Sequence, residues 1–146
     1  MDFPTLKLGR KPNQFLMAPD GLCQAAIPHA ESPVFNVPAA NLMRRLLDMA
    51  AGEERVSVKE ISEEALAVKL VARSRVFRFP DMIDCQILPV DSNSSTLAVY
   101  ARARFGYRDF GVNRARISGW VRRLQQGISV GNAVWHVTDI TLLTRD

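Results

Sequence analysis

Several features that mark common protein classes are scarce in this 146-residue sequence. It has only two cysteines, Cys23 and Cys85, which are far apart and in no CxxC pair, so neither a disulfide framework nor a zinc site is indicated. We expect two buried thiols, with a single disulfide as the alternative in an oxidising compartment. It also has only two histidines, His29 and His136, and neither lies in a recognisable nucleophile motif.

Long apolar runs and cofactor motifs are missing as well. No stretch approaches the roughly 18 apolar residues of a membrane-spanning helix, and the start MDFPTLKLGRKPNQF lacks the apolar core of a signal peptide. The sequence has no GxGxxG after a strand, no GxxxxGK[ST], no HExxH and no EF-hand loop. We therefore expect a soluble chain with no metal and no cofactor.

The basic residues are concentrated in the middle of the chain. Residues 66–123 hold eleven Lys or Arg against four Asp or Glu, a net charge of +7, whereas the whole chain carries +4. Fifteen of the nineteen basic residues are arginines, whose planar guanidinium fits carboxylate and phosphate groups. A genome rich in G and C produces the same ratio, so the ratio alone does not indicate a ligand.

The distribution of prolines and of apolar residues predicts an α+β domain. Six of the eight prolines lie in the first 38 residues, so we expect residues 1–36 to form an extended N-terminal arm that packs on a single domain, residues 37–146. Apolar residues at helical spacing predict one helix from Pro38 to Gly52 and a second from Asp109 to Gly127.

Alternating segments between and after these helices predict strands. Residues 55–61 and 66–79 indicate a hairpin, although a helix capped by Ser57 with Glu60 three residues later is the alternative. Further strands are predicted at 82–90 and 96–105, with a last one at 132–143. Short turns between them favour an antiparallel meander of four or five strands, with the two main helices on one face.

Alternation along these strands places several arginines on one face of the sheet. If the strands pair in order, Asp84 is surrounded by Arg73, Arg75, Arg102 and Arg104. An ordinary solvated face with cross-strand ion pairs is the equal alternative. Arg102 and Arg104, however, lead directly into a helix start, where backbone N–H groups can bind an anion.

We therefore predict an arginine-lined anion or partner site where this strand meets the helix. Asp109 is expected to cap the helix, Gly106 and Gly111 to supply unusual backbone angles, and Asn113 to lie buried on its inward side. Asp81 and Asp84 are expected to be neutralised by nearby arginines. The predicted ligand-binding residues are Arg75, Arg102, Arg104, Tyr107, Asp109, Asn113 and Arg114, with Asp81 and Asp84 as acidic partners.

The segment RARFGYRDFGVNRARI resembles the signature of domain of unknown function 1499, a family of uncharacterised bacterial and plastid proteins. The family pattern is G-Y-x-D-x-G-V-N-R-x-R-I after an arginine-bearing strand. The residues that fit it are Arg102, Arg104, Gly106, Tyr107, Asp109, Gly111, Val112, Asn113, Arg114, Arg116 and Ile117. Upstream, Phe79, Asp81 and Asp84 also fall at the family's offsets, and the resemblance covers roughly residues 12–126.

The resemblance brings no established activity. Met82 stands where a second acid is common, and Ala101 and Ala103 replace small hydroxyl residues, which argues against chemistry assisted by a hydroxyl. Family members are often preceded by an anchor or export signal. The resemblance therefore implies the soluble part of an exported or membrane-anchored protein of the bacterial cell envelope, although the location itself stays open.

The function that these observations favour is a non-enzymatic binding or structural module with a small anionic ligand or a protein partner. One alternative is an uncharacterised enzyme that uses Asp81, Asp84 and Asp109 for acid–base work. The other is a weak binder of nucleic acid. The positive charge of residues 66–123 and the aromatic ring of Tyr100 favour this alternative. The oligomeric state is left open.

Overall fold

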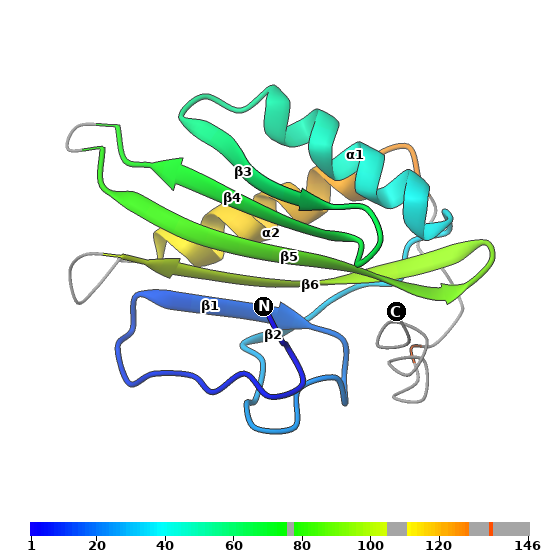
Figure 1. Ribbon diagram of the computed structural model, residues 1–146, viewed down its shortest axis with the longest axis horizontal. Helices are drawn as coiled ribbons and strands as arrows, with labels where there is room; N and C mark the ends of the chain where they lie inside the picture. The colour runs from blue at the N-terminus through cyan, green and yellow to red at the C-terminus, as the bar shows by residue number, and fades with distance from the viewer. Residues whose placement is uncertain (76–77, 105–110, 129–134, 136–146) are drawn as a thin grey trace.

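The computed structural model describes residues 1–75, 78–104, 111–128 and Trp135. Within these ranges the chain folds into one six-stranded sheet and two helices (Figure 1). In chain order the elements are β1 (Gln14–Ala18), β2 (Ala30–Glu31), α1 (Ala39–Ala51), β3 (Val56–Ser62), β4 (Ala67–Arg73), β5 (Pro80–Asp91), β6 (Ser94–Ala103) and α2 (Val112–Gln125). The predicted α+β class is confirmed.

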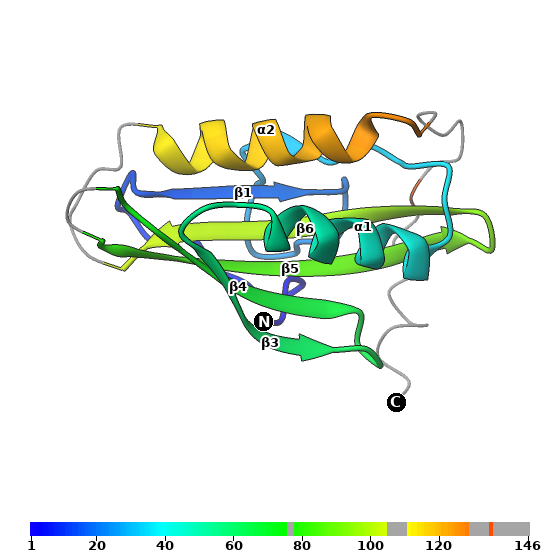
Figure 2. The same cartoon turned by 90° about the horizontal axis from the view of Figure 1, so that it is seen from above.

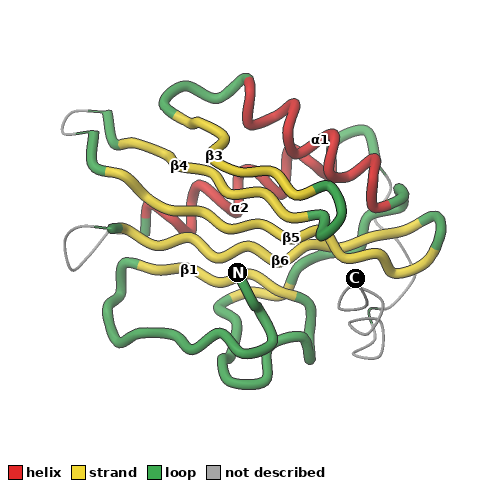
Figure 3. Tube along the Cα trace, in the orientation of Figure 1, coloured by secondary structure: helices red, strands yellow, loops and turns green. Residues whose placement is uncertain are grey.

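The strands lie in the order β2-β1-β6-β5-β4-β3 (Figure 3). β3 to β6 form the predicted antiparallel meander, so the helical alternative for the segment around Ser57 is wrong. The predicted strand count was too low, because residues 1–36 contribute β1, antiparallel to β6, and the short β2, parallel to β1. The last predicted strand, 132–143, lies almost wholly outside the described residues.

Both helices pack on the same face of the sheet (Figure 2). α1 contributes Leu42 and Leu46, and α2 contributes Ile117 and Trp120, to a core that also includes Ile83 from the sheet. A smaller apolar cluster lies on the opposite face. Its members come from the N-terminal segment, the sheet and Trp135, and they are Phe3, Leu16, Ala18, Leu22, Leu88, Ala98, Tyr100 and Trp135.

The register of the central strands decides which side chains share a face. Lys69, Asp84 and Tyr100 lie side by side on β4, β5 and β6, and Leu16 of β1 pairs with Tyr100. Because side chains alternate along a strand, this row faces away from the helices. Ile83, one residue before Asp84, is buried under the helices.

α2 begins three residues later than predicted. Its N-cap is Gly111, whose φ of 79° lies in the left-handed region, and no described side chain makes a capping hydrogen bond there. Asp109, which we expected to cap the helix, and Gly106 lie outside the described residues. The predicted backbone role of Gly111 is confirmed.

Replacing Gly111 with alanine should therefore cost stability through the backbone alone. A Cβ at this position meets no atom within 4 Å, so the expected loss of about 1–2 kcal/mol comes from the left-handed angle. Gly119→Ala is the matched control, because Gly119 lies inside the same helix and its Cβ also meets nothing. That control should gain about 0.5–1 kcal/mol in urea unfolding, and equal effects at the two positions would contradict the account.

Candidate functional site

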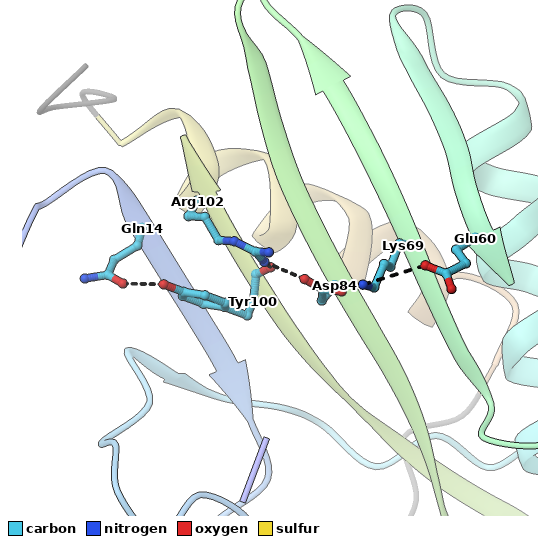
Figure 4. Close-up of polar contacts among 6 residues, drawn as sticks. All are labelled: Gln14, Glu60, Lys69, Asp84, Tyr100 and Arg102. Atoms are coloured by element: carbon cyan, nitrogen blue, oxygen red, sulfur yellow. Dashed lines mark hydrogen bonds and ion pairs between the residues drawn. The ribbon is translucent and has the colours of Figure 1, made fainter. Parts of the chain in front are cut away.

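The polar side chains on the sheet face away from the helices form separate hydrogen-bonded or ion pairs (Figure 4). Arg102 donates from Nη1 to Oδ2 of Asp84 at 2.5 Å, and its guanidinium lies 4.9 Å from the centroid of the Tyr100 ring. Tyr100 donates its hydroxyl to Oε1 of Gln14 at 2.6 Å. The side chain of Asp84 is only 6% exposed, and its carboxylate forms an ion pair with Arg102. The predicted neutralisation of this carboxylate by an arginine is therefore confirmed.

Among the described residues, Arg102 is the one arginine that forms an ion pair with Asp84. Arg73 is exposed and donates from Nη1 to the carbonyl of Arg78 at 3.1 Å. β4 ends at Arg73, so Arg75 lies beyond the strand rather than on its face. Just after the strand, Ser74 and Phe79 are hydrogen-bonded to each other. The backbone N–H of Arg104 donates to the carbonyl of Pro80.

Asp81 belongs to the opposite face, under α2. Its carboxylate accepts a bond from Nη1 of Arg116 at 2.9 Å, and the same nitrogen donates to Oδ1 of Asn113 at 2.8 Å. Asn113 is fully buried, and its amide donates to the carbonyl of Asn13 at 3.4 Å. The predicted burial of Asn113 and its bond to backbone are therefore confirmed.

The two acidic residues do not form a catalytic pair. Asp81 pairs with an arginine on the helix-covered face, whereas Asp84 pairs with Arg102 on the other face. The sheet lies between the two carboxylates. The geometry gives them the character of two separate structural ion pairs.

A cationic cavity lies where α2 begins. It has a volume of about 240 Å³ and brings together Arg114 and Gly111 of the helix start with the N-terminal residues Lys11 and His29. The other described residues that line it are Pro12, Gln14 and Phe15. None of these described residues is acidic, and we call this hollow the corner cavity.

The phenyl ring of Phe15 contacts two side chains of the corner cavity. The guanidinium of Arg114 lies 4.7 Å from its centroid, and the imidazole of His29 stacks on it with centroids 5.7 Å apart. Such cation–π contact fixes a guanidinium without neutralising its charge. Among the described residues, no carboxylate forms an ion pair with Arg114 or Lys11.

His29 is held in one tautomer. The backbone N–H of Leu16 donates to Nδ1 of His29 at 2.8 Å, so the neutral ring carries its proton on Nε2. Partial burial of the ring, and then the charge of Arg114, lower the pKa of His29 below its ordinary value of 6.5. At neutral pH the ring is therefore an uncharged hydrogen-bond donor within the cavity.

The two thiols differ in their surroundings. Cys85 is buried among the residues under the helices, and burial raises its pKa to about 12. Cys23 is half-buried beside the smaller cluster, and burial raises its pKa as well. Both are free, so the predicted burial is confirmed for Cys85 and only partly for Cys23. Among the described residues, no three His, Cys, Asp or Glu side chains gather closely enough to hold a metal ion.

The predicted site residues are divided by the sheet. Arg102 faces away from the helices, while Arg114 and Asn113 belong to the helix on the other side. Tyr107 and Asp109 lie outside the described residues. Three residues that sequence reasoning did not assign to the site, Lys11, His29 and Arg116, lie at this corner or next to it. No local sequence signal marks the first two, because long-range strand pairing brings them to the helix.

A family model described as a protein of unknown function (DUF1499) matches residues 7–124, which is most of the chain. The chain belongs to the DUF1499 family. No curated protein matches it. The matched range of this DUF1499 chain runs from the N-terminal residues that line the corner cavity to Leu124 near the end of α2. No helix in the described part of the chain combines the length and apolar character needed to cross a membrane.

Proposed function

We propose that this DUF1499 protein is a non-enzymatic binding module that holds a small oxyanion, a phosphate or carboxylate group, in the corner cavity. The observation that supports the proposal is the composition of that cavity. It gathers Lys11, Arg114 and His29, and none of its described lining residues is acidic. Among the described residues, no carboxylate offsets the charges of Lys11 and Arg114, so an anion bound between them relieves their mutual repulsion.

The contacts within the cavity fit a binding role. Arg114 is steadied by Phe15 rather than by a carboxylate, so its N–H donors keep their charge for a ligand. His29 adds a neutral donor, and the adjoining start of α2 adds the positive end of a helix dipole. The pairing of Asp81 and Asp84 with arginines on opposite faces also favours binding over acid–base catalysis.

Inorganic phosphate should raise the melting temperature of the chain. A ligand that binds only the folded state raises the free energy of unfolding by RT ln(1 + [L]/Kd). This is about 2.7 kcal/mol when the ligand concentration is one hundred times Kd. The measurement is a thermal scan at constant ionic strength, with phosphate replacing chloride. Arg114→Gln should diminish the rise.

Arg122→Gln provides the control, because Arg122 is exposed in the last turn of the same helix and does not line the corner cavity. It removes one positive charge, as Arg114→Gln does. If both variants keep the full rise, phosphate binds elsewhere on the chain, and if both lose the same share of it, phosphate acts through general charge. Either result means that the proposed site is wrong.

A further inference from the structure

A second arginine-lined cavity lies at the start of β3 and the end of β4. It has a volume of about 450 Å³ and is lined by Arg55, Val56, Ser57, Arg73 and Arg78. Among the described residues, none lines both this cavity and the corner cavity. Three of its five described lining residues are arginines, and none is acidic.

Hydrogen bonds from Arg73 connect the three arginines. The N–H of Arg73 donates to the carbonyl of Arg55 at 2.9 Å, and Nη1 of Arg73 donates to the carbonyl of Arg78 at 3.1 Å. Next to Arg78, the N–H of Phe79 donates to Oγ of Ser74 at 2.9 Å. Arg73 is thus the link between the other two.

Two of these arginines have a backbone conformation that is unfavourable for a residue with a side chain. The φ angles of Arg55 and Arg78 are 61° and 57°, both in the left-handed region. Non-glycine residues in such regions cost of order 1–3 kcal/mol and persist only where the surrounding structure over-determines them. The backbone of Arg55 and of Arg78 is therefore held by its surroundings, which include the hydrogen bonds that both carbonyls accept from Arg73.

Little negative charge offsets these arginines. Among the described residues, Glu54 is the one carboxylate that pairs with any of the three, with Oε2 3.3 Å from Nη1 of Arg55. The side chain of Glu54 is 88% exposed and that of Arg55 is 37% exposed. Exposed pairs of this kind contribute about 0–1 kcal/mol, so Glu54 competes only weakly with an anion that several arginines bind together.

We propose that this cavity is a binding site for a phosphate group carried by a small molecule. Guanidinium groups bind phosphate oxygens through parallel, charge-assisted hydrogen bonds, and three of them around one cavity suit a dianion better than a single carboxylate. The volume falls within the range of about 300–1,000 Å³ that is typical of small-molecule pockets. The side chain of Ser57 adds a hydroxyl to the wall.

The test is a titration of the whole chain with inorganic phosphate and with glycerol 3-phosphate, followed through the Nε–H signals of the arginine side chains by NMR. The signals of Arg55, Arg73 and Arg78 should shift together and saturate. Tighter binding of the ester than of free phosphate supports a carried phosphate group, and equal or weaker binding of the ester overturns that part of the proposal. Signals of these three residues that stay still, or drift without saturation, overturn the site itself.

Variants separate this site from diffuse charge and from the corner cavity. Arg78→Gln should weaken binding at least about tenfold, since losing one charge-assisted bond corresponds to 1.4 kcal/mol or more. Arg75→Gln, which removes an exposed charge nearby but outside the lining, should change it less than about twofold. Equal losses in the two variants overturn the proposal.

Glu54→Gln tests the wild-type geometry without removing an arginine. The carboxylate of Glu54 competes with phosphate for the guanidinium of Arg55. Removing the charge of Glu54 should therefore tighten phosphate binding, and weaker binding would contradict the proposed geometry. Arg114→Gln should leave the signals of this cavity unchanged. The corner cavity is followed separately through the signal of Arg114, so failure of one site does not hide the other.

Discussion

Arg102→Met is expected to lower the free energy of unfolding by about 2–3 kcal/mol. The substitution removes the donor that lies 2.5 Å from Oδ2 of Asp84 and leaves a carboxylate of which only 6% is exposed. Breaking fully buried ion pairs costs about 3–5 kcal/mol. Arg102 itself is 30% exposed, so solvent reduces the effect below that range. Urea unfolding measures the loss.

Two further variants show whether the loss of stability comes from the unpaired, buried carboxylate of Asp84. Adding Asp84→Leu to Arg102→Met removes the uncompensated carboxylate, so the double variant should be more stable than Arg102→Met alone. Lys69→Met breaks the exposed pair between Lys69 and Glu60, whose atoms are 3.7 Å apart, and should cost less than about 1 kcal/mol. A loss in Arg102→Met no larger than in Lys69→Met would contradict the account.

Asn113→Leu is expected to destabilise the chain by about 1–3 kcal/mol. The amide of Asn113 is fully buried and connects α2 to the N-terminal segment through the carbonyl of Asn13. Leucine has the same number and branching of side-chain heavy atoms but leaves that carbonyl and one donor of Arg116 without this partner. The denaturation midpoint reports the change.

A matched substitution at an exposed position of α2 shows what a new leucine costs by itself. Arg122→Leu lies on the solvent side of the helix, where most substitutions change stability by no more than about 0.5 kcal/mol. If Asn113→Leu proves as mild as Arg122→Leu, the buried amide does not anchor the helix to the N-terminal segment.

Local patterns predicted most of the described fold. Turn residues bound the segments of β3 to β6, and β3 and β4 alternate in part between apolar and polar residues. Both helices carry an apolar stripe followed by a glycine. These elements could therefore be predicted from their own segments. β1 has no such alternation, because residues 15–18 are buried on both faces of the sheet. Its prolines on either side, Pro12 and Pro19, further favoured an extended arm over a strand of the sheet.

The candidate site was predictable only in part, for a geometrical reason. Arg102 and Arg114 are close in the chain, which led us to place them in one site. Side-chain alternation, however, turns Arg102 away from the helices, while α2 returns across the other face. Lys11 and His29 reach the corner cavity through the pairing of β1 with β6 and β2, which depends on contacts far apart in the sequence.

The most direct test of the corner cavity is the titration of His29 by NMR with and without sulfate, whose charge is constant where histidine titrates. A bound anion favours the protonated imidazole, so sulfate should raise the pKa of His29 from its lowered value. In Arg114→Gln the pKa should be higher from the outset, because a positive neighbour is gone, and sulfate should no longer move it. A His29 pKa that sulfate leaves unchanged, or raises equally in wild type and Arg114→Gln, would contradict an anion site at this corner.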